Sequence, residues 1–320
     1  SLKASVILKD LAPFVPALSR FEEPLDLNLV FSGHGKHLDC PTLQLANHHG
    51  LMIAGEAALS NWDAGMDMYI YGKLGNLIMT KEGINVLMTN LTGKVPPILQ
   101  RLDYIRFNGE AAGYLHDLTL TGLFYTGAGM VKTDVMMSID EQSMSRTYSG
   151  SVASADLDLG KLLNQEKKFG KVDFNVELKG FNYKNRYPES YIKGIISSFE
   201  YSQYQYENIM LDGVYKDGGF NGRLSMDDAN GSVQIDGNFN VAKTIPDFNL
   251  KASVKNLRPH DLHLSDKYEN ASISLGLTAD FTGKSIDDMN GRISLDSLQL
   301  NAPDEGGCFL DNLTITAGQV

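Results

Sequence analysis

The sequence predicts a mostly β protein, an elongated antiparallel sheet that repeats along its length, curves into a U-shaped or taco-like form and carries short helical crossing segments. Three observations predict this fold class. Apolar and polar residues alternate with period two from end to end, as in strands with one buried face. Gly-rich and Asn-Gly pairs interrupt the alternating runs, and a longer motif recurs along the chain.

The alternation is clearest between residues 206 and 240, which read YENIMLDGVYKDGGFNGRLSMDDANGSVQIDGNFN. Because successive strand side chains point to opposite faces, each run has an apolar side and a polar side. The breaks include KDGG, Asn230-Gly231 and, further on, Asn290-Gly291. Such pairs supply the positive φ that tight hairpins need, so they predict antiparallel neighbours joined by short turns.

The recurring motif begins with Ser-Val, passes through a Leu-spaced segment, enters an alternating strand and ends at Gly. It occupies residues 5–33, 151–180 and 253–283, with a weaker copy over 85–109. These spacings are too long and irregular for a parallel β-helix, but they fit repeats of several strands that stack edge to edge. The predicted division is 1–84, 85–150 (degenerate), 151–252 and 253–320 (truncated), together one continuous elongated module.

The Leu-spaced segments LKDLAPFVPALSRF and DLGKLLNQEKKF are expected to form one or two helical turns. Pro13 and Pro16 exclude a longer helix in the first segment, since proline lacks a backbone N–H and clashes with the preceding turn. The stretches PFVPAL and LGKLLNQ within them are apolar enough to plug a groove in the sheet.

The composition, 42% hydrophobic and 21% charged over 320 residues, is typical of a folded protein. The formal net charge of −11 disfavours nucleic acid as a partner and disfavours polybasic docking on anionic lipid headgroups. No segment approaches the ~20 apolar residues of a membrane-spanning helix. Strand-like runs at both ends suggest a piece of a longer protein. Whether Cys40 and Cys308 pair stays open.

Catalytic and metal-binding signatures are weak throughout the sequence. We expect no enzyme activity and no cofactor, since no nucleophile elbow, P-loop or zinc-protease pattern occurs. Asp227 and Asp228 stand in DDANG, where aspartate favours a turn. His34, His37 and Cys40 have HxxHxxC spacing, but odd-numbered offsets on a strand place neighbours on opposite faces, so we predict no metal site.

The Tyr-rich stretch FEYSQYQYEN has two interpretations. Tyr201, Tyr204 and Tyr206 could form a stacking platform for sugars, but the chain has a single tryptophan, Trp62. We favour a cluster at a strand edge, because Tyr is a good strand former.

The remaining candidate site is the apolar face of the sheet. Such a face most often forms the interior of a closed sandwich, yet the sequence lacks Ig-like units of ~100 residues. A single curved sheet with its apolar face inward would form a long trough. The predicted groove-lining residues are Leu27, Leu29, Phe31, Phe174, Val176, Leu178, Ile209, Leu211, Leu224, Met226, Val233, Ile235, Phe239, Ile273, Leu275 and Leu277. Met210 has the opposite parity to Leu211, so at most one of these two neighbours lines the groove.

The recurring motif, the stretch 206–240 and the stretch 247–300 resemble the AsmA-like repeat proteins of Gram-negative envelopes, most closely the TamB branch found in Bacteroidetes. The resemblance is clear over 172–320 and weaker over 1–171. It implies an internal fragment of a periplasmic protein that an N-terminal helix, absent here, holds in the inner membrane. It also implies a β groove that carries phospholipids to the outer membrane, with no catalytic residues. A barrel partner would bind regions outside this sequence.

Three functional hypotheses follow. The first is a groove that shields phospholipid acyl chains and supports outer-membrane biogenesis. The second is a scaffold whose strand edges template the strands of outer-membrane β-barrels. The third is an envelope glycan-binding or adhesive β protein.

Overall fold

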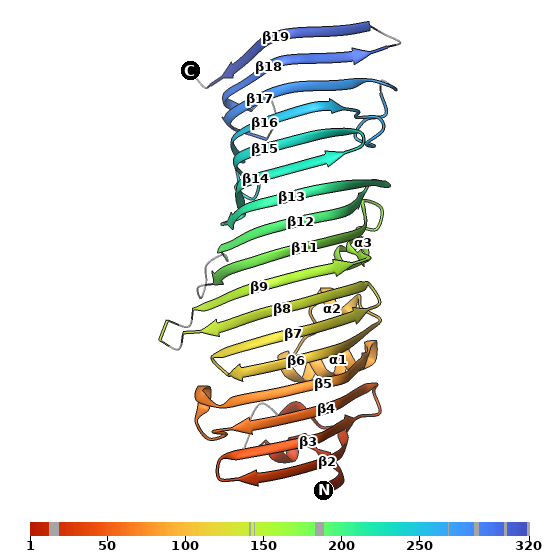
Figure 1. The fold of residues 1–320 in the computed structure, drawn as a ribbon, viewed down its shortest axis with the longest axis vertical. Helices are drawn as coiled ribbons and strands as arrows, with labels where there is room; N and C mark the ends of the chain where they lie inside the picture. Colours follow the sequence, from red (N-terminus) through yellow and green to blue (C-terminus); the bar gives the residue numbers. More distant parts are fainter. Residues whose placement is uncertain are drawn as a thin grey trace. The chain divides into compact units, whose positions relative to one another are not determined.

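A computed structural model describes residues 1–12, 19–140, 142–143, 145–182, 189–267, 269–284, 288–303 and 306–318. The chain forms two compact units. Unit 1 comprises residues 1–142 and 148–166, and unit 2 comprises residues 143–147 and 167–320. The protein is mostly β, with 68% of its residues in strands and 9% in helices, so the predicted fold class is confirmed (Figure 1).

Unit 1 is an antiparallel sheet whose strands follow one another in chain order. Each strand from β1 to β8 pairs with the next. The strands are β1 (Leu2–Ile7), β2 (Pro24–His34), β3 (His37–Ala46), β4 (Leu51–Ser60), β5 (Tyr69–Thr80), β6 (Tyr104–Tyr114), β7 (Asp117–Thr126), β8 (Gly129–Ile139), most of β9 (Arg146–Ala155) and β10 (Leu157–Asp158). The helices are η1 (Leu8–Leu11), η3 (Gly65–Asp67), α1 (Lys81–Thr92), α2 (Pro97–Gln100) and α3 (Leu159–Leu163).

Unit 2 has the same plan without any helix among its described residues. Its strands again pair antiparallel in chain order from β11 to β19. They are β11 (Phe169–Asn182), β12 (Glu189–Tyr201), β13 (Tyr204–Lys216), β14 (Gly219–Asp228), β15 (Gly231–Asn240), β16 (Asp247–Leu257), β17 (Ser272–Thr282), β18 (Asn290–Ala302) and β19 (Gly306–Ala317). The sheet stays open, as the predicted fold class required.

The Leu-spaced segments are the connections between strands. Residues 8–23 join β1 to β2 and begin with the 3-10 helix η1, and the segment after β10 forms the five-residue helix α3. In the copy over 253–283, a buried turn around Leu262 takes this place between β16 and β17. The prediction of one or two helical turns therefore holds for α3.

Two other predictions are not tested. PFVPAL lies outside the described residues, and the division into four repeats stays a prediction.

The weaker copy of the motif differs from its expected form. Residues 85–109 begin inside α1, a full helix of 12 residues, where the motif predicts only a short crossing segment. The Thr80 hydroxyl accepts a hydrogen bond from the Gly83 N–H at the N-cap, and Gly93 ends the helix in the left-handed conformation at φ 77°. Both are standard helix boundaries.

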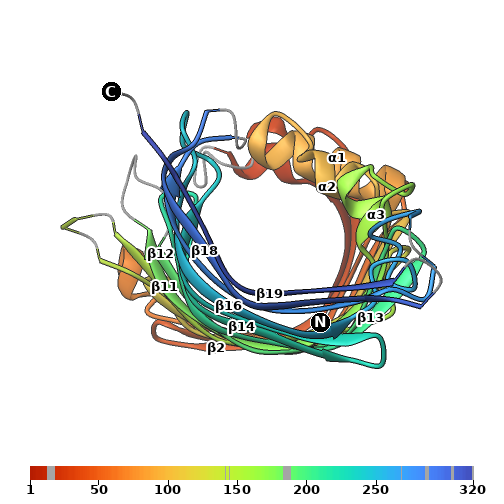
Figure 2. The ribbon, with the colours of Figure 1, turned by 90° about the horizontal axis from the view of Figure 1, so that it is seen from above.

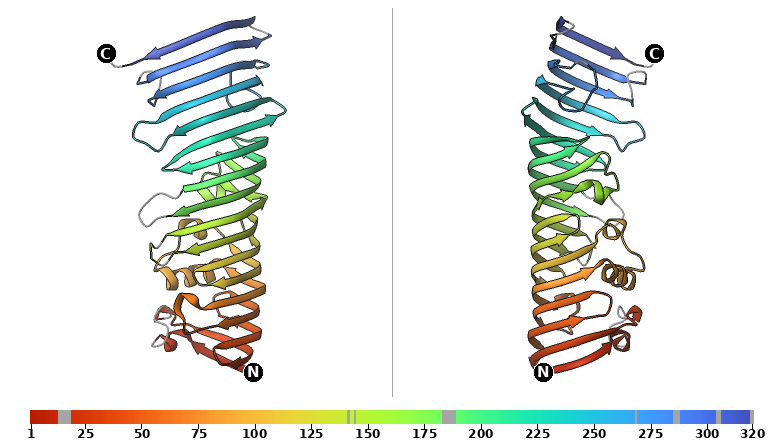
Figure 3. Two further views of the ribbon diagram at one scale, coloured as in Figure 1. Left: turned by 60° about the vertical axis from the view of Figure 1, so that its left-hand side comes forward. Right: turned by 90° about the vertical axis from the view of Figure 1, so that its right-hand side faces the viewer.

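The helices of unit 1 cover one end of its apolar face. Ile84 of α1 and Leu102 after α2 are buried against Ile105 of β6 and Ala128, and Leu162 of α3 packs on the same cluster. Figure 2 shows α1 and α2 on the inner side of the curved strands of unit 1, and the right-hand view of Figure 3 shows them standing to one side of that sheet. Among the described residues, none of the helices has the length and hydrophobicity of a membrane span.

Two expected hairpin turns are placed differently. Asn290 and Gly291 belong to β18 and do not form the turn, which precedes them. The β14–β15 loop consists of Ala229 and Asn230, because Gly231 already pairs with Asp228 in the sheet. The turn is therefore one residue earlier than the expected Asn230-Gly231 pair, and Asn230 has no positive φ. KDGG behaves as predicted, since Asp217 and Gly218 adopt φ of 50° and 79° between the paired Lys216 and Gly219.

Candidate functional site: the apolar face of unit 2

The strand register of unit 2 gathers apolar side chains into rows that run across the sheet. Paired residues in neighbouring strands lie side by side on one face. One row passes through Val176, Gly194, Leu211, Leu224, Ile235, Ala252, Leu277, Leu295 and Leu313. The next passes through Phe174, Ile196, Ile209, Met226, Val233, Val254 and Leu275.

These rows place the predicted lining residues. Of the thirteen predicted in unit 2, eleven stand in the two rows just described or in the adjoining row through Leu178 and Ile192. Phe239 stands at one border of this face, and Ile273 stands beyond a register shift between Val254 and Leu257. We call this surface, the face that carries Leu211 and Leu224, the apolar face of unit 2. That its residues line a lipid groove stays a prediction.

Side chains on the apolar face are half-buried. Leu211, Leu224, Ile235 and Leu277 all keep part of their surface open to solvent. The described residues of unit 2 contain no helix, so unit 2 supplies no helical layer of its own over these rows. At one end of the strands, Leu262 is fully buried in the turn between β16 and β17. An apolar surface that stays partly wet can take up an apolar ligand.

An aromatic row borders the apolar face at one end of the strands. Tyr215, Phe220, Phe239, Phe248 and Phe281 are consecutive cross-strand partners from β13 to β17. The rings of Phe248 and Phe281 stack at 4.7 Å between centroids, and those of Phe220 and Phe239 lie 5.8 Å apart. Of these only Phe239 was predicted as a lining residue. The alternation already indicated this face for two others, because Phe220 and Phe281 stand at even offsets from the predicted lining residues Leu224 and Leu277.

At the other end of the strands, the Tyr-rich stretch forms an internal cluster. Tyr206 is buried and its hydroxyl donates to the Leu262 carbonyl oxygen at 2.8 Å. The Tyr204 hydroxyl donates to Asp228 Oδ1 at 2.5 Å and accepts from the Asn230 amide. Burial, followed by the bond to Asp228, raises the pKa of Tyr204 to about 12. With these hydroxyls engaged, the residues form the strand-edge cluster that the sequence favoured.

The opposite face of unit 2 is polar and carries a row of alternating charge. Glu177, Lys193, Asp212, Arg223, Asp236 and Lys251 are consecutive cross-strand partners on six strands. Arg223 Nη2 lies 3.1 Å from Asp236 Oδ2, and Lys193 Nζ lies 3.5 Å from Asp212 Oδ2. Each of the four inner charges, from Lys193 to Asp236, thus stands between opposite charges, an arrangement that favours this register.

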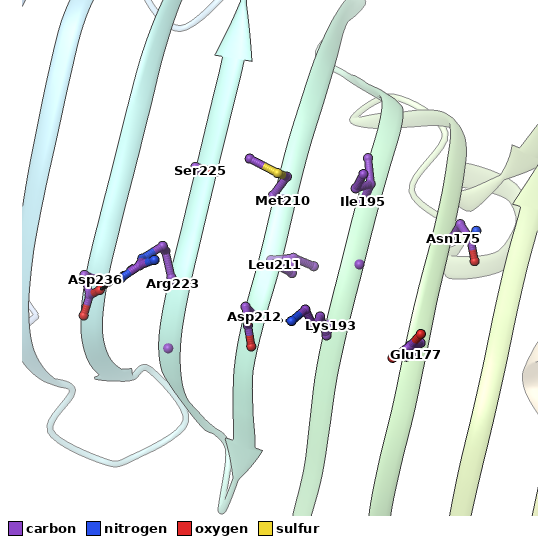
Figure 4. Close-up of a pocket in the computed structure, with 12 residues that line it drawn as sticks. Asn175, Glu177, Lys193, Ile195, Met210, Leu211, Asp212, Arg223, Ser225 and Asp236 are labelled. Carbon is purple, nitrogen blue, oxygen red and sulfur yellow. Dashed lines mark hydrogen bonds and ion pairs between the residues drawn. The ribbon is translucent and has the colours of Figure 1, made fainter.

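A depression of about 750 Å³ lies on this polar face (Figure 4). Figure 4 shows Met210 and Asp212 on one side of β13 and Leu211 on the other. The parity argument is therefore correct: Met210 is on the polar face, with 53% of its surface exposed, and Met226 is on the apolar face. The bond from the Tyr191 hydroxyl, the largest cause, holds the pKa of Asp212 below its ordinary value. Every charge that lines this depression has an opposite charge as its cross-strand neighbour. These charged groups therefore serve one another and do not by themselves indicate a ligand.

In unit 1 the predicted lining residues lie on β2. Leu27 pairs with Leu45 and Leu29 with Leu43, which extends apolar rows across β2 and β3. Phe31 sits at a register shift between Val30 and Ser32 and is 48% exposed. The bulge therefore separates Phe31 from the regular rows, a local irregularity that strict alternation does not reveal.

The histidine and cysteine residues singled out by the sequence make local contacts. His37 Nδ1 lies 2.7 Å from Ser60 Oγ, and its Nε2 lies 3.0 Å from Asp39 Oδ2. His34 pairs with His37 across the β2–β3 turn, and the Cys40 thiol donates to the Thr42 carbonyl oxygen. Across the described part of the chain, no three His, Cys, Asp or Glu side chains are placed to hold a metal ion. Both cysteines are free thiols.

Comparison with protein-family models, with curated proteins and with solved structures finds no match to this chain.

Proposed function

We propose that this protein is a non-catalytic β-groove module of the AsmA-like, TamB-related type, which shields phospholipid acyl chains on their way from the inner to the outer membrane. The observation that supports the proposal is the apolar face of unit 2, where one row of half-buried, mostly aliphatic side chains crosses nine strands and a second crosses seven. We place the protein in the periplasm and in outer-membrane biogenesis on the strength of the sequence resemblance.

The physical argument concerns the cost of moving a phospholipid through water. Two acyl chains expose about 30 methylenes, and at ~0.8 kcal/mol each their hydration opposes desorption by roughly 20–25 kcal/mol. A surface that stays apolar from strand to strand keeps the tails dry at each step, and the headgroup can remain in solvent. This lowers the barrier without any chemistry at the protein.

The side chains on the apolar face suit a variable cargo. They are aliphatic and branched, and Met226 adds a flexible thioether that can adapt to chains of different length and saturation. The aromatic row through Phe220 and Phe239 forms one border of this surface. No charged side chain stands within the two central rows, so an acyl chain would displace water without leaving a charge unsolvated.

Site-specific photo-crosslinking in cells tests the proposal. A photoreactive residue is placed at Leu224 on the apolar face and, as the matched control, at its neighbour Ser225 on the polar face. Phospholipid adducts at position 224 and none at position 225 are the expected result. Crosslinks at position 224 only to other parts of this chain would mean a closed core and would overturn the proposal.

A further probe on β19, the last strand of unit 2, tests the scaffold alternative. Adducts between this strand and an outer-membrane barrel protein, without lipid at position 224, would favour the scaffold that templates strands. The glycan-binding alternative has little support, because Tyr204 and Tyr206 direct their hydroxyls to internal partners.

A further inference from the structure

His49 stands between two carboxylates in unit 1. Its Nε2 lies 2.6 Å from Glu23 Oε2, and its Nδ1 lies 2.7 Å from Glu82 Oε1. The three residues come from three elements: Glu23 directly precedes β2, His49 is in the β3–β4 turn, and Glu82 is in the first turn of α1. The imidazole therefore links two parts of the sheet to the start of the helix.

The backbone around His49 is fixed. The Asn47 side-chain oxygen accepts hydrogen bonds from the N–H groups of His49 and Leu51, which closes the turn. The Thr80 hydroxyl donates to the His49 carbonyl oxygen at 3.0 Å while it caps α1. Hydrogen bonds of the His49 backbone thus fix the imidazole next to the N-terminus of α1.

Both ring nitrogens face a carboxylate oxygen, an arrangement that favours a proton on each nitrogen. A neutral imidazole has one N–H and one lone pair, so it can serve only one of two flanking carboxylates, whereas an imidazolium serves both. Glu23 Oε2 is buried, and its 2.6 Å approach to Nε2 is an ion pair rather than an aligned hydrogen bond. Only a positive ring compensates that buried oxygen.

The contact between residues 19–23 and α1 is otherwise loose. A cavity of about 330 Å³ lies there, lined by Arg20, Glu22 and Glu23 on one side and by Asn85, Val86, Thr89 and Asn90 of α1 on the other. Glu22 is engaged with Lys9 on its own segment. The His49 bridge is accordingly a direct polar connection between Glu23 of this segment and the N-terminal turn of α1.

We propose that Glu23, His49 and Glu82 form a pH-sensitive clasp, in which protonated His49 holds the N-terminal turn of α1 against the sheet of unit 1 and neutral His49 lets that turn loosen. Ile84, fully buried, keeps the rest of the helix in place. The clasp therefore governs local opening over Met79 and Ile105, the apolar strand residues beneath the helix. This inference is independent of the lipid-groove proposal.

The direction of the pH dependence follows from the charges around the ring. The hydrogen bond with Glu82 is the largest influence and raises the pKa of His49, burial opposes it, and attraction to Glu23 and Glu82 raises it further. Glu23 and Glu82 are the charged groups that face the ring. A raised folded-state pKa means that the clasp is complete below the ordinary histidine value of ~6.5 and is lost as pH rises through the folded-state value.

NMR titration of the histidine rings, with amide hydrogen exchange of residues 85–88 corrected for intrinsic rates, tests the clasp, because these N–H groups make the first intrahelical hydrogen bonds of α1. We expect His49 to titrate above its ordinary value and the protection of these amides to fall several-fold across that titration. His49→Gln should abolish this pH dependence, whereas His48→Gln, one residue away and exposed, should preserve it. Glu23→Gln, which keeps the side chain but not its charge, should lower the His49 midpoint.

A His49 midpoint at or below the ordinary value would overturn the proposal. So would protection of residues 85–88 that does not change with pH in the unsubstituted protein. If His49→Gln fails to fold, the Glu23→Gln midpoint and the hydrogen exchange of the unsubstituted protein still decide the matter.

Discussion

The phenyl ring of Phe220 occupies the space that a side chain on Gly213 would need. A β-carbon built on Gly213 would lie 2.6 Å from Phe220 Cζ, and Gly213 pairs directly with Gly222, two residues beyond the phenylalanine. In unit 1 the ring of Phe107 stands in the same relation to Gly122, where a β-carbon would lie 2.5 Å from Phe107 Cε2, and Gly122 pairs directly with Gly109. Both phenylalanines open the sequence Phe-Asn-Gly, so glycine serves here to admit an aromatic ring.

Gly213→Ala should therefore destabilise unit 2 by about 1–3 kcal/mol, because the new methyl group meets Phe220 and the Asn221 carbonyl oxygen at 2.6 Å. Urea denaturation measures this as a lower midpoint. Gly276→Ala is the matched control, since its nearest neighbour would be 3.5 Å away. That substitution should be neutral or stabilise by up to ~1 kcal/mol. Equal losses in both variants would contradict the packing argument.

Tyr206→Phe should cost about 1–2 kcal/mol in the free energy of unfolding. It removes the hydroxyl that donates to the Leu262 carbonyl oxygen and leaves this buried acceptor without that partner. Tyr191→Phe removes a comparable bond, from the Tyr191 hydroxyl to Asp212 at 2.7 Å, but at an exposed site. Its effect should stay within ~0.5 kcal/mol. Thermal or urea unfolding of the two variants distinguishes the cases.

The raised pKa of Tyr204, about 12, predicts sensitivity to alkali. Because the folded protein favours the neutral phenol, the stabilising contribution is complete below the ordinary value of ~10 and is lost as pH rises from there towards 12. Stability measured against pH should fall over this window. Tyr204→Phe should flatten the fall, and the ultraviolet difference spectrum between the two proteins should show one phenol that ionises late. A phenol that ionises at its ordinary pH would refute the prediction.

Asp212→Lys should destabilise unit 2 through the row of alternating charge. The new ammonium group would stand directly between its cross-strand neighbours Lys193 and Arg223, where like charges each cost roughly 0.2–1 kcal/mol. Added salt should recover part of the loss, because these side chains are exposed and screened. Asp227→Lys, opposite Ser232 on β15, makes the same change of charge and should have little effect. Denaturation at low and high salt measures both.

The faces of the strands could be predicted from the sequence, because alternation alone decides which neighbours share a side. Met210 and Leu211 on opposite faces of β13 are an example. Interruptions of the alternation could not be read in this way. Phe174 pairs with Ile196 but Asp173 pairs with Ser198, so β12 shifts by one residue against β11, and nothing in the alternation marks this shift.

Contacts between segments that are distant in the sequence could not be predicted, because no local pattern names the partner residues. His48 and His49 precede Gly50 and predict a turn, which the structure contains, but nothing local points to Glu23 or Glu82 as partners. Helix α1 had local signals in Thr80 and Gly93 that match its two boundaries. The resemblance of residues 85–109 to the recurring motif hid these signals, because the motif predicts a short crossing segment and a strand there, and not a helix of 12 residues.

The strict succession of strands has a consequence for how such a chain can change length. From β1 to β8, and again from β11 to β19, each strand pairs with the ones before and after it in the sequence. Contacts in such a sheet are local along the chain, so folding can begin at any hairpin and spread. An insertion or deletion of two strands preserves the direction of every later strand, and every later connection stays at the same end of the sheet. Insertion or deletion of a single strand reverses the direction of all later strands and moves their connections to the opposite end. We therefore expect this architecture to gain or lose whole hairpins.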